Sequence, residues 1–567
     1  MRRMAIFLMA LTGCATATGR FPTRNWVEDL AEKPPPAKTA HRATRFVREW
    51  SMTHPGTGRY ALAEAPADDA VAQSLATQAR NSGGKMFTDA GVACFASEIA
   101  RFFDAFDGEP GNELMTFIAT RCGLPSTRLQ TTSLFWKAEQ VKDDEHLARL
   151  ALPEVDRMLT VVRREGRQAL GSAMFRGARV AVVVLASLSP AVELEPLAEQ
   201  AEPGSIVVLR GRSLGPETEL QASVTRGEAD WAVCESAGKD GRFEFRCPVA
   251  KEDRTARIEV FGRSKERLLG ATLAVLELGV GAPLPRSHTL PDEKPMPLSE
   301  AASISAALVS EFNVRRADAK REPLLIEARQ ERLADRVAPH LSAAMSRDPA
   351  QADLIALGML AGWDVAGLVE RGTMKGIQVP SGGDLHEVVR SIMASPTGRA
   401  QVLSDRSNRI AIGSLVDAEG SAAVFLFSYE VVLAWAPEAE AARVREAVNQ
   451  ARVKAGVAPL GWDESAASTC IDAARGVAGQ VAEPKDALTA LGELLRVRGQ
   501  YGSTFVAGFS GDGAFKVDPS LLDPSLTQVG LTVFHVRPPN EPWVRRLALF
   551  FFPRGVGQIA CADEVGF

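Results

Sequence analysis

The chain has 567 residues, which is enough for roughly three to five domains. Hydrophobic residues make up 46% of it and charged residues 24%, proportions that are ordinary for packed domains and exclude a disordered chain. The formal net charge is −5 and no basic stripe with interleaved aromatic residues occurs, so we expect no nucleic-acid partner. Seven histidines also argue against an enzyme with several metal ions.

The N-terminal residues have the pattern of an export signal. Two arginines are followed by a short apolar run at 4–11, well below the roughly 20 helical residues that cross a bilayer. The run leads into Leu11-Thr12-Gly13-Cys14, which resembles the lipobox of bacterial lipoproteins, so we expect Cys14 to be acylated. Ala15 follows in place of an acidic residue, and by resemblance to enterobacterial sorting this favours the outer membrane. The alternative is an ordinary secretory signal with a chance cysteine.

Two proline-rich stretches predict connections between domains. The first lies within residues 15–44, where Pro34-Pro35-Pro36 would hold an extended, semi-rigid spacer behind the anchor. The second, at residues 281–300, divides the chain into halves. We therefore predict a tether in the first stretch and a linker in the second.

Residues 196–280 consist of short runs of strand-forming residues separated by polar turns, which predicts a small immunoglobulin-like β-sandwich. Asp240-Gly241 is a strong two-residue turn signal, because both residues tolerate positive φ. A turn at this dipeptide places position 234 opposite position 247 on the neighbouring strand. Both positions are cysteines, so we expect Cys234 and Cys247 to lie close enough to bridge.

The remaining segments contain an internal repeat. One spacing of residues occurs twice, as Asn313, Arg316 and Pro323-Leu324 and again as Asn449, Arg452 and Pro459-Leu460. Each set stands at the end of an amphipathic helix, and an apolar strand closes each unit. The first half of the chain has the same ending at residues 169–185, so three units of one type are predicted.

The cysteines sort into pairs within these units. When Cys14 is set aside, six of the seven cysteines remain, and an even number in an exported chain indicates disulfides. The expected pairs are Cys94 with Cys122, Cys234 with Cys247, and Cys470 with Cys561. The alternative is that they are buried free thiols.

Three stretches carry a family resemblance: Asn449 to Asp463 with its Arg452, Gly456 and Pro459-Leu460; Ser395-Pro396-Thr397-Gly398-Arg399-Ala400; and Leu522-Asp523-Pro524. They resemble the helix start, the Ser-Pro-x-His-Arg-Ala motif and the following stretch of the bacterial CAP superfamily, the SCP-like proteins related to cysteine-rich secretory, antigen 5 and pathogenesis-related proteins. The resemblance covers the second and third units and extends only faintly to the first. It implies a three-layer α-β-α sandwich for each unit.

The family's central cavity carries two histidines and two acidic residues able to hold a metal, and this chain keeps almost none of them. Gly398 stands where the motif has its histidine, and Val517 takes the corresponding place in the third unit. Val369-Glu370-Arg371 keeps only the acid of the family's Gly-Glu-Asn motif. We therefore expect no metal and no cofactor. Glu370 is the one candidate for a residual cavity, and a solvated helix-end carboxylate is the alternative.

Other signals of chemistry are incomplete. His386-Glu387 is half of a zinc-protease helix motif, but Arg390 stands where the second histidine is needed, which favours exposed helix surface. Gly508-Phe509-Ser510-Gly511-Asp512 lacks the final glycine of a nucleophile elbow. Trp363 and Trp543 are candidates for a contact surface, with packing in the core as the alternative.

These observations predict an α+β chain in which degenerate, repeated CAP-like units accompany one immunoglobulin-like β-sandwich. The expected function is that of a cell-envelope lipoprotein without catalytic residues, a binding or scaffold module that contacts envelope proteins, peptidoglycan or lipid. The alternatives are a hydrolase and a lipid- or sterol-binding protein that uses a residual cavity around Glu370. The predicted boundaries are 1–14 for the signal and lipidated cysteine, 15–44 for the tether, 45–190 for unit one, 196–280 for the β-sandwich, 281–300 for the linker, 301–436 for unit two and 437–567 for unit three.

Overall fold

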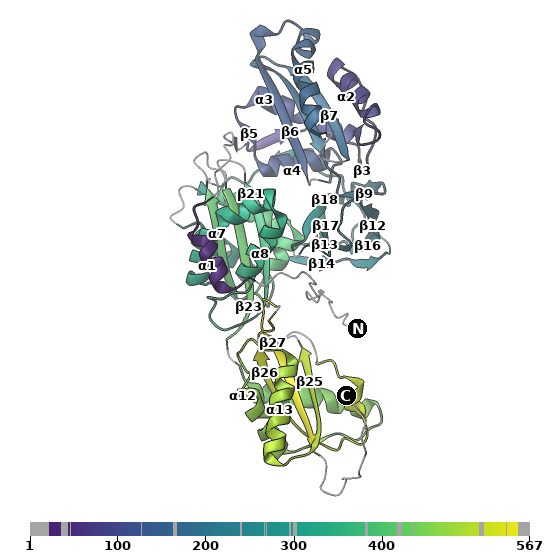
Figure 1. Ribbon diagram of the computed structural model, residues 1–567. Coiled ribbons are helices and arrows are strands. Elements are labelled where there is room, and N and C mark those ends of the chain that lie inside the picture. Colours follow the sequence, from purple (N-terminus) through teal and green to yellow (C-terminus); the bar gives the residue numbers. More distant parts are fainter. Residues whose placement is uncertain are drawn as a thin grey trace.

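The computed structural model describes residues 22–553, except 36–43, 46, 126–127, 163–166, 239–240, 266, 268, 294–295, 299–302, 380–383, 417–421, 434, 510–514 and 540. Cys14 and Cys561 lie outside the described residues. The fold is mixed α+β, with helices α1 to α13 and several small sheets. Figure 1 shows an elongated molecule with unit one at one end, the β-unit beside unit two in the middle and unit three at the other end.

The same order of elements occurs three times along the chain. Unit one contains α2 (Ala70–Arg80), β4 (Met86–Thr88), α3 (Ala90–Ala105), α4 (Asn112–Arg121), β6 (Leu129–Lys137), α5 (Asp144–Val162), β7 (Gln168–Arg176) and β8 (Val180–Leu188). Unit two contains α6 (Ile304–Asp318), β20 (Leu325–Ile326), α7 (Ala328–Arg347), α8 (Pro349–Leu360), β21 (Leu368–Val379), α9 (Leu385–Ala394), α10 (Pro396–Val402), β22 (Arg409–Val416) and β23 (Ala422–Val432). Unit three contains α11 (Pro437–Lys454), β24 (Gly461–Trp462), α12 (Glu464–Arg475), α13 (Pro484–Arg498), β25 (Gly502–Phe509), the 3-10 turn η3 (Pro519–Leu522), β26 (Gln528–Val536) and β27 (Arg545–Pro553).

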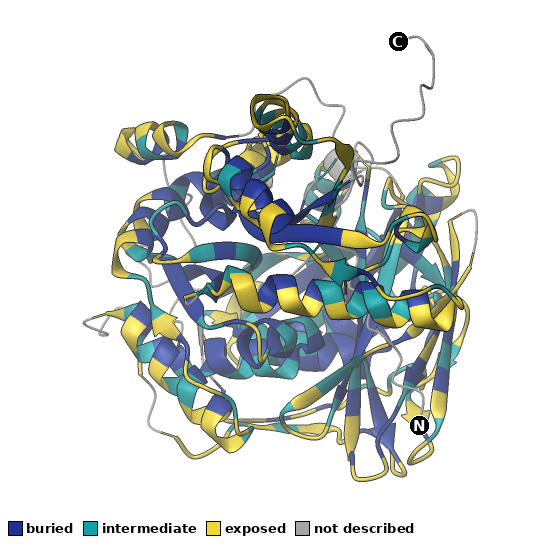
Figure 2. Cartoon of the chain, turned by 90° about the horizontal axis from the view of Figure 1, so that it is seen from below, coloured by how far each residue is buried: buried dark blue, intermediate teal, exposed yellow. Residues whose placement is uncertain are grey.

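The three units also share one sheet topology. The strand orders are β4-β7-β8-β6, β20-β22-β23-β21 and β24-β26-β27-β25, with the short first strand parallel to its neighbour and the other pairs antiparallel. Apolar cores lie on both faces of each sheet, and helices cover both faces. The central strands are buried along nearly their whole length, and Figure 2 shows the sheet interiors in the colour of buried residues. Their sequences are mostly apolar because helices cover both faces of the sheet. This arrangement is a coarse α-β-α layering.

The repeated asparagine and arginine fix the same local structure in units two and three. Arg452 is 1% exposed, and its guanidinium donates to the carbonyl oxygens of Ala458, Leu521, Asp523 and Leu526 at 2.7–2.9 Å. Asn449 holds the following turn, because its amide oxygen accepts from the backbone N–H of Leu460 at 2.8 Å. A buried guanidinium is tolerated here because every side of it meets a hydrogen-bond acceptor.

The corresponding residues of unit two make the same contacts. Arg316 is also 1% exposed and donates to the carbonyl oxygens of Glu322, Val402, Ser404 and Ser407. Asn313 accepts from the N–H of Leu324 at 2.8 Å. The repeat found in the sequence is thus a device that ties the first helix of a unit to the segment before the central hairpin.

The β-unit consists of two facing sheets that share one apolar core. One sheet has the order β11-β18-β17-β13-β14 and the other β15-β16-β12-β9. The strands are β9 (Val192–Leu194), β11 (Gln200–Ala201), β12 (Ile206–Ser213), β13 (Glu219–Arg226), β14 (Asp230–Val233), β15 (Glu235–Ala237), β16 (Arg242–Pro248), β17 (Thr255–Arg263) and β18 (Ala271–Val280). The predicted hairpin register is confirmed, because Glu235 pairs with Arg246 and Ala237 with Glu244. Asp240 itself lies outside the described residues, and Gly241 has a φ of 76°.

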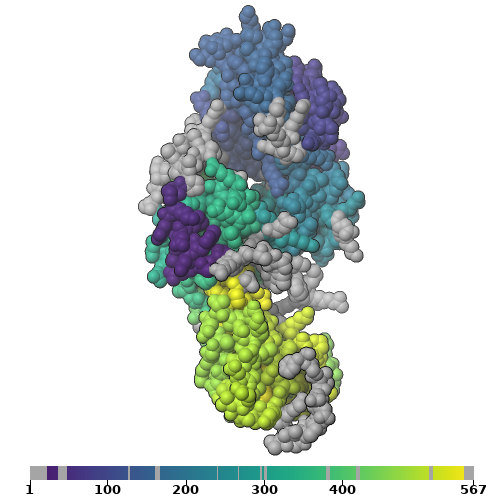
Figure 3. All heavy atoms as spheres, in the orientation of Figure 1, coloured from purple at the N-terminus to yellow at the C-terminus, as the bar shows by residue number. Residues whose placement is uncertain are grey.

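The predicted tether contains a helix that packs on unit two. Helix α1 (Arg24–Glu32) buries Val27, Leu30 and Ala31 against α7 and α8, and Figure 3 shows it lying on the surface of unit two. The approach is close enough that a Cβ added to Gly358 of α8 would lie 2.4 Å from Val27. An extended spacer is therefore the wrong description of residues 24–32, because apolar side chains spaced three and four residues apart form a helix face that unit two covers.

The predicted proline-rich linker is also held in place. Within residues 281–300, β19 (Ser287–Thr289) pairs antiparallel with β2 (Glu49–Ser51), and Arg121 donates to the carbonyl oxygen of Pro285 at 2.8 Å. The side chain of Asp384 accepts from the N–H of Met296 at 2.7 Å. Two further pairs of short strands complete the contacts around unit one. Strand β1 (Thr44–Arg45) pairs with β5 (Glu109–Pro110), and β3 (Arg59–Tyr60) pairs with β10 (Leu197–Ala198) of the β-unit. The linker is a strap between units one and two rather than a free spacer.

Candidate functional site

Glu370 lies in the joint between units two and three. It stands on strand β21 and not at a helix end, and its carboxylate accepts two hydrogen bonds from Arg546 of β27, the longer at 2.9 Å. His535 of β26 places Nε2 at 3.1 Å from the same carboxylate. Arg546 also lies 3.3 Å from Glu440 of α11. The acid that the sequence singled out for a cavity is thus engaged by basic side chains of the next unit.

The surroundings keep Glu370 ionised. Burial alone would raise the pKa of its carboxyl, but the hydrogen bonds from His535 and Arg546 outweigh burial and hold the pKa below its ordinary value. Trp435 covers the cluster, with its ring centroid 3.9 Å from that of His535. The side chain of Glu370 is 15% exposed. A carboxylate held in this way is suited to fastening two units and poorly placed to accept a substrate proton.

Trp363 and Trp543, which were candidates for a contact surface with packing in the core as the alternative, belong to the same joint. Trp543, in the hairpin between β26 and β27, packs into the core of unit two and donates its indole N–H to the carbonyl oxygen of Leu360 at 2.9 Å. Arg537 of the same hairpin stacks 4.3 Å above the ring of Trp363 in unit two. Both aromatic residues therefore contact another part of this chain.

A second polar cluster joins unit two to the β-unit and was not predicted. Lys375 of β21 donates to the hydroxyl oxygens of Ser395 and Thr397, at 2.5 and 2.7 Å. Both hydroxyl groups donate to one oxygen of Glu259 on β17, at 2.8 and 2.7 Å. Burial lowers the pKa of Lys375, whereas the positive charges of Lys375 and Arg257 lower that of Glu259 against the effect of burial.

The chemistry of this cluster is that of a serine with a lysine at hydrogen-bond distance, an arrangement that can serve acyl transfer. Here Ser395 is 2% exposed and Glu259 is 3% exposed, and the serine oxygen also accepts from the N–H of Gly398 to cap α10. The Ser395 hydroxyl therefore makes hydrogen bonds to Lys375, Glu259 and the Gly398 N–H, all of them within the chain. No sequence signal could reveal it, because Glu259 lies 136 residues from Ser395 along the chain.

Gly398 stands where the structure leaves no room for a side chain. A Cβ added at Gly398 would lie 2.1 Å from the carbonyl oxygen of Ile392, so no larger side chain fits without moving the turn between α9 and α10. The neighbouring Arg399 reaches out of unit two and donates to the carbonyl oxygens of Gly227 and Asp230 at 2.8 and 2.9 Å. The stretch that resembles the family motif is used here for docking against the β-unit.

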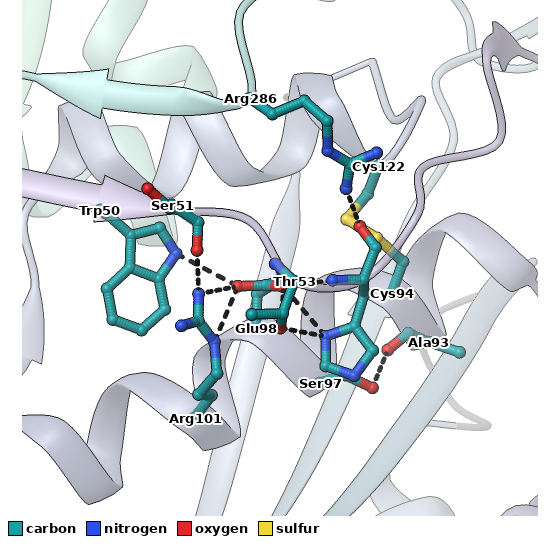
Figure 4. Close-up of polar contacts among 11 residues, drawn as sticks. Trp50, Ser51, Thr53, Ala93, Cys94, Ser97, Glu98, Arg101, Cys122 and Arg286 are labelled. Carbon is teal, nitrogen blue, oxygen red and sulfur yellow. Dashed lines mark hydrogen bonds and ion pairs between the residues drawn. A yellow bond between two sulfur atoms is a disulfide. The ribbon is translucent and has the colours of Figure 1, made fainter.

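A third cluster surrounds Glu98 of α3, which is fully buried (Figure 4). Its carboxylate accepts from the indole N–H of Trp50 at 3.2 Å, from Arg101 at 2.6 Å, and from the N–H groups of Thr53 and His54 at 2.7 and 2.8 Å. The Nδ1 atom of His54 lies 2.9 Å away. Burial would raise the pKa of Glu98, but these hydrogen bonds outweigh burial and hold the pKa well below its usual range.

The Glu98 cluster resembles half of a catalytic arrangement, because a carboxylate orients an imidazole whose side chain is 44% exposed. Its other contacts are structural. Arg101 also donates to the carbonyl oxygen of Ser51, and Arg286 of the strap donates to that of His54. Glu98 therefore ties β2 and the Thr53-His54 segment that follows it to α3, the core helix of unit one. No sequence motif indicated this cluster, since Trp50, Thr53 and His54 lie more than forty residues from Glu98 in a segment without a motif.

The incomplete zinc-protease motif falls in the joint between units one and two. Glu387 is 2% exposed, which corrects the expectation of exposed helix surface for this residue, and it accepts from the N–H of Glu113 at 3.3 Å. Burial, with the negative charge of Glu113 next, raises its pKa to about 7. Arg390 forms a bidentate pair with Glu113 at 2.9 and 3.0 Å. Glu387 and Arg390 thus both connect α9 to α4 through Glu113.

Two of the three predicted cysteine pairs are disulfides in the structure, and the third pair has one member outside the described residues. Disulfides join Cys94 to Cys122 and Cys234 to Cys247, whose Cα atoms are 5.7 and 4.4 Å apart. Cys470 is a fully buried thiol that contacts the carbonyl oxygen of Gly530, and burial raises its pKa to about 12. Its predicted partner Cys561 and the predicted lipidation site Cys14 lie outside the described residues, so both assignments stay predictions.

Two cavities lie away from these clusters. The larger, of about 350 Å³, is in unit one between α3, α4 and β6. The smaller, of about 270 Å³, lies between the β13–β14 turn of the β-unit and the end of α6, and Arg226, Asp230 and Arg321 line it. Glu370, Glu98 and Ser395 line neither of them.

Within the described ranges, no group of three His, Cys, Asp or Glu side chains is arranged to hold a metal ion. Nor does any helix in those ranges have the length and apolar character needed to span a membrane.

Comparisons with known proteins give limited likeness. No family model matches the chain, and no curated protein matches it. Among solved structures, an outer surface protein from Borrelia burgdorferi is 16% identical over 24% of this chain and 98% of its own length, with a TM-score of 0.20. A cysteine-rich secretory protein from Staphylococcus aureus is 13% identical over 46% of this chain and 85% of its own, with a TM-score of 0.19. Na-ASP-1 is 8% identical over 46% of this chain and 90% of its own, with a TM-score of 0.24.

Proposed function

We propose that this chain is a cell-envelope lipoprotein, anchored through Cys14, in which three degenerate CAP-like units and one immunoglobulin-like unit form a rigid binding scaffold. The proposal rests on what the buried polar side chains contact. In each buried cluster, the carboxylates, hydroxyls and imidazoles that an enzyme would present to a substrate are engaged in joints between parts of the chain.

The joints connect all four units. Glu387 lies where unit one meets unit two, Glu259 fastens the β-unit to unit two, and Glu370 fastens unit two to unit three. A further bidentate pair, Arg267 with Asp353 at 2.9 and 3.0 Å, ties the β-unit to α8. Joints that are buried and hydrogen-bonded restrict the relative motion of the units, which suits a scaffold that presents fixed surfaces.

Glu370 is bound by Arg546 and His535. This argues against the alternative of a hydrolase or lipid carrier centred on Glu370. Outer-membrane placement rests on the lipobox-like residues and the absence of an acidic residue after Cys14. The partners proposed are other envelope proteins, peptidoglycan or lipid.

Photo-crosslinking in a bacterium that processes lipoproteins tests the proposal. A photoreactive amino acid replaces one exposed residue at a time, for example Val497 of unit three, which is 78% exposed. We expect the chain in the membrane fraction with covalent adducts to envelope components, and the Cys14→Ser chain in the soluble fraction without them. A wild-type chain that stays soluble and forms no adduct from any unit would contradict the proposal.

A further inference from the structure

The larger cavity lies along the outer edge of a strand in unit one. Strand β6 is the edge of the unit one sheet, and β8 is the one strand it pairs with among the described residues. The cavity is lined by Thr131, Thr132 and Ser133 of β6. Consecutive strand residues point to opposite faces, so a cavity that touches all three reaches the edge of the strand and does not lie under one face alone.

The hydrogen-bond pattern shows which backbone groups face that edge. Two backbone hydrogen bonds mark the ends of the β6–β8 ladder. The N–H of Ala138 donates to the carbonyl oxygen of Arg179, and the N–H of Ser189 donates to the carbonyl oxygen of Arg128. Bonded pairs alternate with unbonded pairs in an antiparallel ladder. Both ends therefore give the same phase: the even-numbered residues of β6 bond to β8, and Thr131 and Ser133 direct their N–H and C=O groups away from it.

The walls of the cavity combine apolar and polar groups. The odd-numbered Leu129 and Phe135 pack toward the core on the α3 side, so the side chains of Thr131 and Ser133 face the same side. Ile99 and Phe103 of α3 and Met115 of α4 supply apolar surface, and Glu109 and Asn112 lie at the wall. The exposed backbone edge offers alternating donors and acceptors beside this apolar surface.

We propose that unit one binds an extended peptide segment of a partner protein, which adds to β6 as a further strand. An extended backbone is the chemistry that matches the outward N–H and C=O groups of Thr131 and Ser133, and alternate side chains of the peptide would enter the apolar part of the cavity. The acidic Glu109 favours a basic residue in that peptide. This inference rests on the proposed binding function and names the class of partner.

A library of displayed ten-residue peptides, selected on the full chain without its signal and with Cys14→Ser, provides the probe. The selected peptides are then titrated against three variants. Ser133→Pro removes one outward N–H without breaking the ladder to β8, and should weaken binding about tenfold or more, the effect of one lost hydrogen bond plus a steric obstacle. Ser133→Ala keeps the N–H and should bind like the wild type.

Met115→Trp fills the cavity and gives an independent test, should the proline variant fold poorly. We expect it to abolish binding while the circular dichroism of the chain is unchanged. Selection of no peptide, or peptides that bind Ser133→Pro and Met115→Trp as well as the wild type, would overturn the inference. In that event, membrane attachment and crosslinks from other units would still support the scaffold function, so the two failures are distinguishable.

Discussion

Replacing Arg452 with methionine should destabilise unit three strongly. The guanidinium serves four buried carbonyl oxygens, at distances of 2.7–2.9 Å, and methionine fills a similar volume without a single donor. An unsatisfied buried polar group costs about 1–3 kcal/mol, so four of them give a loss of at least about 4 kcal/mol even at the lower end of that range. Water that enters the site would reduce the loss but not remove it.

Hydrogen exchange of the β26 and β27 amides is the suitable assay, because a chain of several units does not unfold in one step. The matched control is Arg496→Met, which changes an exposed arginine of α13 and should shift the free energy of opening by no more than about 0.5 kcal/mol. Arg316→Met should produce the same loss in unit two, leaving unit three unchanged. A loss below about 1 kcal/mol for Arg452→Met would refute the reasoning that the repeated arginine holds each unit together.

Three further predictions address the joints and the β-unit. The pKa of Glu387 is about 7 in the folded chain and 4.5 in the unfolded chain, so the folded chain binds the proton more tightly. The free energy of unfolding should therefore fall by on the order of 3 kcal/mol as the pH rises from 4.5 to 7. Denaturant titrations should show that Glu387→Gln abolishes this fall, and an unchanged pH profile would contradict the prediction. Glu370→Gln should loosen the contact between units two and three, since removing one partner of a buried ion pair costs about 3 kcal/mol. Proteolysis of the segment between β23 and α11 should become faster in this variant. The control Glu493→Gln, on the exposed face of α13, should leave the rate of proteolysis unchanged. Replacing Cys234 and Cys247 together by alanine should lower the stability of the β-unit by about 3 kcal/mol, as measured by its thermal unfolding, and no shift would show that the bridge is dispensable.

Sequence reasoning reached the elements whose signals are local. The Asp240-Gly241 turn signal predicted the hairpin register and thereby the proximity of Cys234 and Cys247, because turn chemistry and strand pairing act over a few residues. The spacing from Asn449 to Leu460 marked a real structural device, although the sequence could not show that Arg452 would bind carbonyl oxygens.

The joints were beyond such reasoning, since each joins residues far apart in the chain. Glu259 and Ser395 are brought together by the packing of two units, and neither stretch carries a motif that refers to the other. Helix α1 was missed for a different reason. Its apolar Val27, Leu30 and Ala31 follow a helical spacing that was available in the sequence, but the nearby prolines favoured an extended spacer.

The central claim is that this chain works as a lipid-anchored scaffold, and the intact mass of the mature chain purified from bacterial membranes tests it most directly. The account predicts an N-terminus at Cys14 that carries a diacylglyceryl group, and loss of that mass together with membrane attachment in Cys14→Ser. A mature chain that begins elsewhere, or whose Cys14 carries no lipid, would contradict it.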